Sequence, residues 1–292
     1  MKSPPFDYRR VSTVEEAASV LGEYGDDAKV LAGGQSLMPM LNFRLLRPSL
    51  LLDINALEDL DGVEKDETGL RIGALCRHRS LQRSTDIRTH LPILAHVVPF
   101  IAHVAIRNRG TIGGSLSHAD PSAELALVAL LLDAQIELRS ATETRYVPAH
   151  AFFVDALETA LQPTELLTSV HIATDFQRPQ TALRNWGFME VARRRGDYAV
   201  AAVGVLLSLE GSTIRDARIA VSGVARTPIR LKRVEDALRG EAGSEQVFDA
   251  IVPTACDGLS PDDDLHASGA YRMHLVRTLL GRTLRQAVAH AA

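Results

Sequence analysis

The sequence has 292 residues, 46% of them hydrophobic, which is long enough and apolar enough for two domains that each bury a core. Its formal net charge of -4, with lysines and arginines spread along the chain, argues against the basic surface that nucleic acids require, so we expect no nucleic-acid partner. Only two cysteines, Cys76 and Cys256, are present, far apart and in no CxxC pattern, so this chain alone cannot ligate an iron–sulfur cluster or a cysteine-rich zinc site, and both are expected to be buried.

The N-terminal segment carries no targeting pattern. Residues Met1 to Arg10 read MKSPPFDYRR and lack the apolar core of a signal peptide. The longest apolar run, Leu125 to Leu132, is too short to span a bilayer and is expected in the core. We therefore expect a cytoplasmic protein with no membrane span.

The first third of the chain predicts one short helix and three strands. Ser12 to Glu15 fits a capping box, and the apolar face that starts at Val14 ends at Gly22. Strand-like segments follow at Lys29 to Leu31, Leu50 to Ile54 and Leu70 to Ala74.

The middle of the chain predicts two further helices. Apolar residues at helical spacing from Ile93 to Ala102 indicate a helix that stops near the turn Arg107 to Gly110. Asp120 as N-cap and Pro121 in the first turn indicate the start of the next helix, which carries the apolar run inward.

The remaining strands and helices do not alternate regularly. Strands are predicted at Gln135 to Arg139, Leu166 to Ile172, Val200 to Leu209 and Ala217 to Val221, the last two as antiparallel neighbours. Helices are predicted at Leu231 to Leu238, Gln246 to Val252 and Ala270 to Val288. The polar stretch Thr174 to Thr181 marks a domain boundary. This order favours an α+β fold over a doubly wound parallel sheet.

Two glycine pairs, Gly33-Gly34 and Gly113-Gly114, are candidate diphosphate sites. Paired glycines let backbone N–H groups approach a diphosphate with no Cβ atom in the way, and the nearby hydroxyls of Ser36, Thr111 and Ser115 add donors. Two such pairs facing one cavity would converge on a single diphosphate. A Gly-Gly pair after a strand is also an ordinary turn, so spacing alone leaves both interpretations open.

Other familiar site patterns are missing. Neither glycine pair belongs to a GxGxxG or GxxxxGK[ST] motif, so a Rossmann domain or a nucleoside-triphosphate site is not indicated. His118 has no second histidine or carboxylate at a spacing that makes a triad or a metal site, so it is interpreted as a cofactor-side or hydrogen-bonding residue. We predict no catalytic acid or base and no metal ligand in this chain.

Three segments resemble a known family of flavoproteins. Leu31 to Leu41, LAGGQSLMPML, and Arg107 to Leu125, RNRGTIGGSLSHADPSAEL, resemble the two flavin-binding signatures of the FAD-binding medium subunits of the molybdenum hydroxylase family. That family includes carbon monoxide dehydrogenase, xanthine dehydrogenases and the bacterial nicotine-, nicotinate- and caffeine-type dehydrogenases. Phe188 to Ala199, FMEVARRRGDYA, resembles the segment beside the flavin ring, and length and order match over essentially the whole chain.

The resemblance implies the fold and the domains. It implies an FAD-binding fold of the p-cresol methylhydroxylase and vanillyl-alcohol oxidase type, with two α+β subdomains, followed by a C-terminal domain of the carbon monoxide dehydrogenase flavoprotein type, an antiparallel sheet with helices. Residues 1–176 are then the FAD-binding domain, divided into about 1–55 and 56–176, and residues 177–292 are the C-terminal domain.

The resemblance also implies which residues hold FAD in this chain. It places two segments at the diphosphate, Glu124 at the sugar-like chain of the cofactor, Leu167 against the cofactor, and Asp197 and Tyr198 near the ring. The two segments consist of Ala32, Gly33, Gly34, Gln35, Ser36 and Leu37, and of Thr111, Ile112, Gly113, Gly114 and Ser115.

The implied function is electron transfer within a larger enzyme. The expected partners are a large molybdopterin subunit, where substrate is oxidised, and a small subunit with two two-iron two-sulfur clusters, in a dimer of heterotrimers. FAD would take electrons from those clusters and pass them to NAD, a quinone or oxygen. Two alternatives stay open: a stand-alone FAD-dependent NAD(P)H reductase of the same fold, and a non-catalytic assembly module that has lost FAD.

Some residues depart from the family pattern or allow a plainer interpretation. Met189 stands where several members have a Lys thought to interact with the flavin, and Gln35 stands where some have His, which leaves the flavin potential and the electron acceptor open. The run Arg193 to Arg195 is a solvated stretch or part of a subunit contact, and Asp197 without the resemblance would be a turn residue. Trp186 is assigned to the core.

Overall fold

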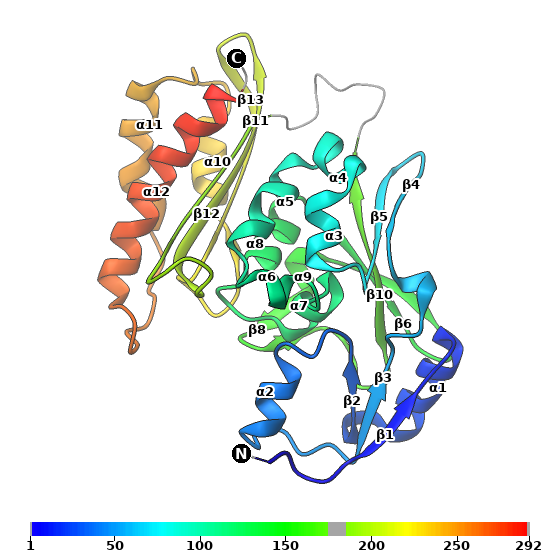
Figure 1. Ribbon diagram of the computed structural model, residues 1–292. Coiled ribbons are helices and arrows are strands. Elements are labelled where there is room, and N and C mark those ends of the chain that lie inside the picture. Colours follow the sequence, from blue (N-terminus) through cyan, green and yellow to red (C-terminus); the bar gives the residue numbers. More distant parts are fainter. Residues whose placement is uncertain (1, 175–184, 291–292) are drawn as a thin grey trace.

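The computed structural model describes residues 2–174 and 185–290; Figure 1 shows a C-terminal sheet and a central sheet with helices between them, and a small N-terminal sheet below the central one. A small N-terminal sheet, a central five-stranded sheet and a C-terminal four-stranded sheet follow one another along the chain. The two larger sheets are antiparallel, so the predicted α+β class is confirmed. The expected boundary between residues 176 and 177 lies outside the described residues.

The N-terminal sheet is parallel, in the order β1-β3-β2. Its strands are β1 (Asp7–Arg10), β2 (Ala28–Leu31) and β3 (Leu50–Asp53), and its helices are α1 (Val14–Tyr24) and α2 (Leu37–Asn42). The apolar face of α1 packs on buried leucines of β3 to form a small core. This sheet ends beside the first glycine pair, which lies between β2 and α2.

The start and end of α1 differ from the prediction. Thr13 rather than Ser12 is the N-cap, because its hydroxyl accepts the N–H of Glu16 at 3.1 Å. The helix runs through Gly22 and ends at Tyr24, followed by Gly25 as C-cap, whose positive φ of 51° is a conformation that glycine adopts readily. Gly22 is therefore an interior residue of the helix.

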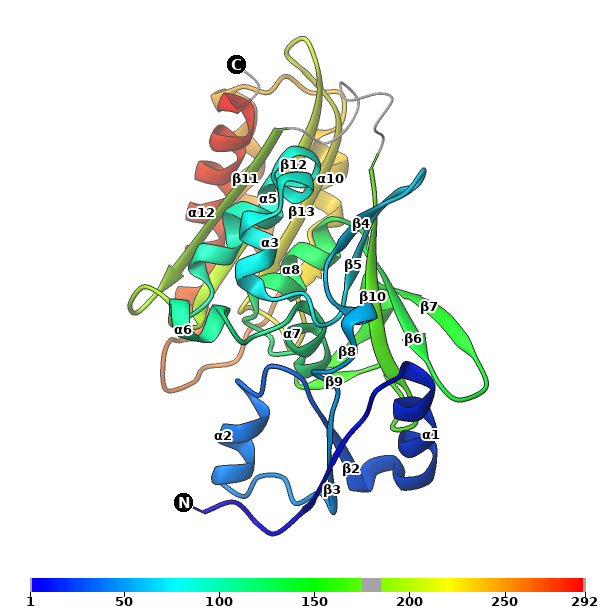
Figure 2. The same cartoon turned by 45° about the vertical axis from the view of Figure 1, so that its right-hand side comes forward.

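The central sheet has the order β4-β5-β10-β6-β7 and lies beside a layer of short helices (Figure 2). The strands are β4 (Val63–Lys65), β5 (Gly69–Gly73), β6 (Gln135–Arg139), β7 (Thr144–Pro148) and β10 (Leu166–Ala173), with a separate hairpin of β8 (Phe153–Asp155) and β9 (Glu158–Thr159). The helices are α3 (His78–Arg83), α4 (Thr85–His90), α5 (Pro92–Val97), α6 (Val104–Arg107), α7 (Ile112–His118), α8 (Glu124–Leu131) and α9 (Ala149–Phe152). Every residue of α8 is buried, so the apolar run is core as predicted.

Two predicted helices in this layer have different bounds. The helix expected from Ile93 to Ala102 ends at Val97, and a 3-10 turn containing Pro99, which has no N–H to donate, follows it. The helix expected from Asp120 begins at Glu124, because the carboxylate of Asp120 accepts the N–H of Ser122 at 2.8 Å and forms a turn instead of a helix cap.

The C-terminal sheet is antiparallel in the order β11-β12-β13-β14 and is covered on both faces. Its strands are β11 (Asn185–Ala192), β12 (Ala199–Glu210), β13 (Thr213–Ser222) and β14 (Ile229–Arg230), and its helices are α10 (Lys232–Leu238), α11 (Glu245–Ile251) and α12 (Gly269–Ala289). Figure 1 shows these three helices on the outer face, while α5 and α8 of the central layer lie on the inner face. The predicted pairing of β12 with β13 and the three predicted helices are confirmed.

Side chains of β12 alternate between two cores. Ala202 and Leu206 pack with the central layer, whereas Val203, Val205 and Leu207 pack with the outer helices. The sheet therefore joins the C-terminal part to the central part through continuous apolar packing. Cys76 and Cys256 are free and buried, as expected, and in the described residues no helix is long and apolar enough to cross a membrane.

Candidate cofactor site

A cavity of about 800 Å³ is lined by residues from the N-terminal, central and C-terminal parts of the chain. All the residues expected to hold the cofactor line it except Ile112, the first residue of α7, which is buried in the core. Other parts of the wall come from the segment between β8 and β10, from Ile101 and Ala102, and from Gly196 between β11 and β12. The cavity thus collects residues that are far apart in the sequence.

The two glycine-containing segments touch each other at one wall of this cavity. A Cβ atom on Gly33 would lie 2.3 Å from the carbonyl oxygen of Arg109 and 2.9 Å from Cα of Gly110. Glycine is therefore required at position 33 by the approach of the second segment, and not by the cofactor alone. Gly34 has a φ of 72°, which turns the chain from β2 into α2.

Arg77 and Asn55 hold these two segments together. Arg77, at the N-terminal end of α3, donates from one guanidinium nitrogen to the carbonyl oxygen of Arg109 at 2.5 Å and from another to the side-chain oxygen of Asn55 at 2.7 Å. The Asn55 amide in turn donates to the carbonyl oxygen of Ala32 at 2.9 Å. Burial lowers the pKa of Arg77 from its usual value. Sequence reasoning missed both residues, since neither belongs to a glycine motif.

The first segment offers unused backbone donors. In the part of the chain that the structure describes, the N–H groups of Gly34, Gln35 and Ser36 donate to no other protein group, and all three residues line the cavity. The Gln35 side chain donates back to the carbonyl oxygen of Gly33 at 2.8 Å, which fixes the turn. Three successive free N–H groups at a concave turn are a suitable site for an anion.

The second segment is a helix and its backbone donors are already used. Gly113 donates to the carbonyl oxygen of Ala74 at 2.9 Å, and Gly114 donates to the Thr111 hydroxyl at 3.1 Å. A Cβ atom on Gly113 would lie 2.6 Å from that of Ala74, so this glycine lets α7 pack closely on the end of β5. The expectation that both glycine pairs present backbone amides to a diphosphate is therefore wrong for the second pair. Ser115 of this segment also lines the cavity and carries a hydroxyl that can donate a hydrogen bond.

Two histidines near the second segment are neutral. His78 is buried, its Nε2 lies 3.0 Å from the carbonyl oxygen of Thr111, and burial lowers its pKa to about 4. Burial also lowers the pKa of His118, which lines the cavity. Both rings are thus uncharged at neutral pH, and His78 supports the backbone that carries Thr111.

Two acidic residues at the cavity differ in burial and in their charged neighbours. Glu124, in the first turn of α8, is only 6% exposed, and burial together with the charge of Glu190 raises its pKa to about 8. Asp197 lies at the edge of the cavity and pairs with Arg193 at 3.1 Å and Arg194 at 3.6 Å. Tyr198 is exposed beside it. The wall at α8 is therefore weakly charged, whereas the rim at Asp197 carries paired charges.

Met189 does not reach the cavity. It pairs with Val203 in the sheet and packs against the C-terminal core. The next residue, Glu190, has the opposite orientation. A direct contact between Met189 and a group in the cavity is therefore not available.

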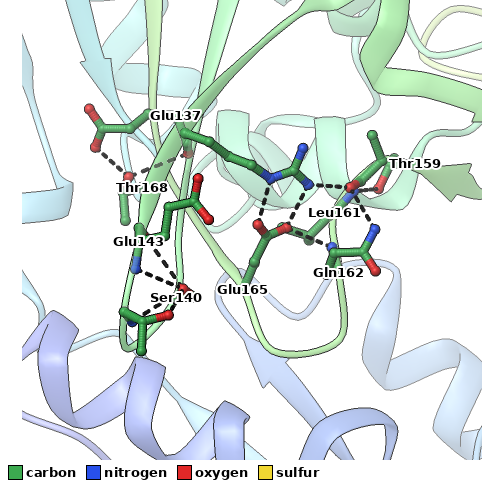
Figure 3. Close-up of polar contacts among 11 residues, drawn as sticks. Glu137, Ser140, Glu143, Thr159, Leu161, Gln162, Glu165 and Thr168 are labelled. Atoms are coloured by element: carbon green, nitrogen blue, oxygen red, sulfur yellow. Dashed lines mark hydrogen bonds and ion pairs between the residues drawn. The ribbon is translucent and has the colours of Figure 1, made fainter.

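The segment that closes the cavity between β9 and β10 depends on one ion pair (Figure 3). Arg145 on β7 donates to Glu165 at 2.6 and 2.9 Å and to the carbonyl oxygen of Ala160 at 2.7 Å. The N–H of Gln162 also donates to Glu165, at 2.8 Å. Although burial alone would raise it, these hydrogen bonds lower the pKa of Glu165.

We expect Arg145→Ala to destabilise the chain by about 2 kcal/mol, because it leaves the half-buried Glu165 carboxylate without its cation. Since the folded-state pKa of Glu165 is depressed, the stability that the pair contributes is present above the unfolded pKa and is lost as the pH falls through the folded value. Chemical denaturation at neutral pH measures the loss. The matched control is Arg139→Ala, since Arg139 pairs with the exposed Glu15 at 2.6 Å and should contribute less than about 1 kcal/mol. Equal losses from both variants would contradict the assignment.

A cavity of this size, with free amides at one turn, hydroxyls opposite and apolar walls, suits a dinucleotide-sized ligand that carries a diphosphate. In the described residues no group of histidines, cysteines and carboxylates could hold a metal ion. The site is therefore typical of proteins that bind an organic cofactor.

The comparisons with known proteins identify the family. Residues 4–174 match the family described as FAD binding domain in molybdopterin dehydrogenase, and residues 186–287 match the carbon monoxide dehydrogenase flavoprotein C-terminal domain. The chain therefore belongs to the family of molybdopterin-dehydrogenase flavoproteins, as its sequence segments indicated, and FAD is its cofactor.

Individual relatives match over the full length. The 6-hydroxypseudooxynicotine dehydrogenase complex subunit alpha of Paenarthrobacter nicotinovorans is 41% identical over 100% of this chain and 97% of its own. The crystal structure of quinoline 2-oxidoreductase from Pseudomonas putida 86 contains a chain that is 34% identical, with a TM-score of 0.94 and 100% of both chains covered. A structure of carbon monoxide dehydrogenase from Hydrogenophaga pseudoflava gives 32% identity, a TM-score of 0.94 and the same coverage.

Proposed function

We propose that this chain is the FAD-carrying electron-transfer subunit of a heteromeric molybdenum-containing dehydrogenase. The observation that carries the proposal is the cavity at which the two glycine-containing segments meet, with three N–H groups in its wall that donate to no group among residues 2–174 and 185–290. The family match and the full-length similarity to subunits of such enzymes support it.

The residues present fit the cofactor, and we assign them as follows. The free N–H groups of Gly34, Gln35 and Ser36 would hold the diphosphate, with the Ser115 hydroxyl opposite. Ala32, Gly33, Leu37, Thr111, Gly113 and Gly114 shape the two segments, and Ile112 anchors the second in the core. Glu124 would contact the polar chain, Leu167 the apolar wall, and Asp197 and Tyr198 the ring end.

Bound FAD would accept electrons singly, store two and release them, which is chemistry that no side chain supplies. The protein's own part is to bind and orient the cofactor and to keep water from its buried face. Arg77 and Asn55 fix the spacing of the two segments, and the segment held by Arg145 covers one side. We assign no catalytic acid or base to this chain.

The partners and domains follow from the same proposal. A large molybdopterin subunit would oxidise the substrate, and a small subunit with two two-iron two-sulfur clusters would deliver electrons, in a dimer of heterotrimers. The chain would divide into residues 1–176, which hold FAD, and 177–292, and the free, buried state of both cysteines fits a cytoplasmic assembly.

The test is flavin reduction in the complex purified through a tag on this chain. N-heterocyclic compounds such as quinoline and nicotine derivatives, suggested by the relatives' names, are mixed with it without oxygen and the flavin absorbance is followed. We expect substrate-dependent bleaching that disappears when the iron–sulfur subunit is removed. Unchanged bleaching without that subunit, or full turnover of the isolated chain with NADPH, would overturn the proposal in favour of a stand-alone reductase.

A further inference from the structure

Left-handed residues other than glycine gather at the cavity. Among residues 2–174 and 185–290, the non-glycine residues with a positive φ, between 43° and 61°, are Arg44, Ala102, Ala119, Asp133 and Leu157. Ala102 and Leu157 line the cavity, and Ala119 lies between two residues that do. This backbone conformation costs free energy when a Cβ atom is present, and residues held in it cluster at binding sites. The strained positions are therefore concentrated at the cavity wall.

Leu157 is the least expected of these residues. It is the second residue of a two-residue turn between β8 and β9, in which Asp155 pairs with Glu158, and its φ is 61°. A left-handed residue in such a turn is normally glycine or asparagine. Leucine has a Cβ atom that glycine lacks, and it has no polar side chain to form the local hydrogen bonds of asparagine. Its backbone is therefore strained at this position.

The surrounding structure holds Leu157 in this conformation. The hairpin lies beside α7 (Figure 2), and the N–H of Leu157 donates to the carbonyl oxygen of Ala119, the C-cap of α7, at 3.0 Å. At the start of the turn, Asp155 accepts two hydrogen bonds from Arg226 of the C-terminal part, one of them at 3.0 Å. A strained conformation persists only where its neighbours fix it, and these contacts fix the turn from two other parts of the chain.

The side chain of Leu157 is an exposed apolar part of the cavity wall. It is 54% exposed and lines the cavity. Val154, on the same hairpin, is 57% exposed but does not line the cavity. An apolar side chain that is half exposed in a cavity gains free energy when a ligand covers it. Leu157 therefore has the properties of a contact residue for an apolar part of a ligand.

We propose that Leu157 is a further binding residue of this cavity, and that its strained backbone holds the side chain against an aromatic ring of the bound FAD. FAD has such a ring at each end, so the group that Leu157 contacts is planar and largely apolar. The identity of the ligand rests on the proposed function, whereas the strain is a property of the chain alone. Leu157 contributes contact area and takes no part in electron or proton transfer.

Substitutions at this position should therefore have two separate effects. Removing the side chain should weaken FAD binding, because apolar area that the ligand covers is lost. Removing the Cβ atom as well should stabilise the folded chain relative to alanine, which reverses the usual order in which glycine is the less stable of the two. A residue with a purely structural role would change the stability without changing the FAD affinity.

The binding experiment compares the wild type with Leu157→Ala, Leu157→Gly and Leu157→Met in the complex purified through a tag on this chain. FAD is removed, and its rebinding is followed by flavin fluorescence. We expect the alanine and glycine variants to lose about tenfold in FAD affinity, equivalent to about 1.4 kcal/mol, and the methionine variant to stay within about threefold of the wild type. The matched control is Val154→Ala, which removes a similarly exposed apolar side chain outside the cavity and should leave the affinity unchanged.

Binding of ADP to the same variants identifies the ring. A loss of ADP affinity equal to that of FAD places Leu157 at the adenine, and unchanged ADP affinity places it at the flavin.

Thermal unfolding of the full-length chain without FAD gives the second measurement. Leu157→Gly should unfold at a temperature at least about 2 °C above that of Leu157→Ala, because only glycine relieves the strain. Wild-type FAD affinity in both variants would refute the contact with the cofactor, and a lower unfolding temperature for glycine than for alanine would refute the strain. A complex that holds no FAD, although the glycine variant is the more stable, would refute the proposed function and leave the strained turn intact.

Discussion

Gly33→Val is expected to abolish flavin retention, with a loss of affinity of at least about a hundredfold, equivalent to about 2.8 kcal/mol. Even its Cβ atom would lie 2.3 Å from the carbonyl oxygen of Arg109, which is backbone and cannot rotate away. The two cavity segments must therefore separate, and the donors at Gly34 to Ser36 move away from the hydroxyl of Ser115. Overpacking of this kind also costs about 1 to 3 kcal/mol of folding free energy.

The flavin content of the purified variant and its denaturation midpoint measure these two losses. The matched control is Gly22→Ala, because nothing lies within 4 Å of a Cβ atom at this interior position of α1. It should keep its flavin and gain up to about 1 kcal/mol from improved helix propensity. A yellow Gly33→Val protein with wild-type affinity would show that the approach of the two segments is not needed for binding.

Local patterns in the sequence were sufficient to predict most of the buried strands and helices. Strands β6, β10 and β12 and helices α10, α11 and α12 were predicted within a few residues, because their apolar residues recur at the spacing of one buried face or form continuous buried runs. The glycine segments were recognised for a similar reason, since glycine is required where backbones approach each other. The chemistry expected of the second pair was wrong, because the N–H of Gly113 donates to Ala74 in the tertiary structure and the N–H of Gly114 donates to Thr111, a local helix cap that sequence reasoning missed.

The missed elements lack such a local signal. Strand β1 reads Asp-Tyr-Arg-Arg and all four residues are exposed, so it is a strand only because it pairs with the buried β3. Asp120 and Pro121 have the composition of a helix start, but the side chain of Asp120 satisfies a turn instead.

The residues that support the site were harder still to predict. Arg77 lies 22 residues from Asn55 and 32 from Arg109, and only the folded chain brings the three together. Met189, which drew attention through the family pattern, packs into the C-terminal core because of its register in β11. Sequence reasoning therefore predicted most of the residues that line the cavity, while the contacts that hold the two segments together required the structure.

Arg77→Gln should be the second most damaging of these changes, because Arg77 joins the carbonyl oxygen of Arg109 to Asn55 and so to the first segment. A glutamine is too short and has too few donors to reach both acceptors, so the carbonyl oxygen of Arg109 and the side chain of Asn55 lose a charge-assisted partner. We expect a loss of about 2 to 3 kcal/mol in folding free energy and at least about tenfold in FAD affinity. Arg77→Lys should recover only part of this, because a single ammonium cannot reproduce the fork of donors.

The neighbouring Arg79 supplies the control for this experiment. It lies two residues further along α3 and makes one exposed hydrogen bond, to the side chain of Asn108 at 2.9 Å. Arg79→Gln removes the same charge from the same helix, yet should change stability by less than about 0.5 kcal/mol and leave flavin content unchanged. Calorimetric binding of FAD to each variant separates the loss of a bridge from the loss of a charge. If both variants lose affinity equally, general electrostatic attraction holds the cofactor, and the hydrogen-bonded bridge through Arg77 has no special part in it.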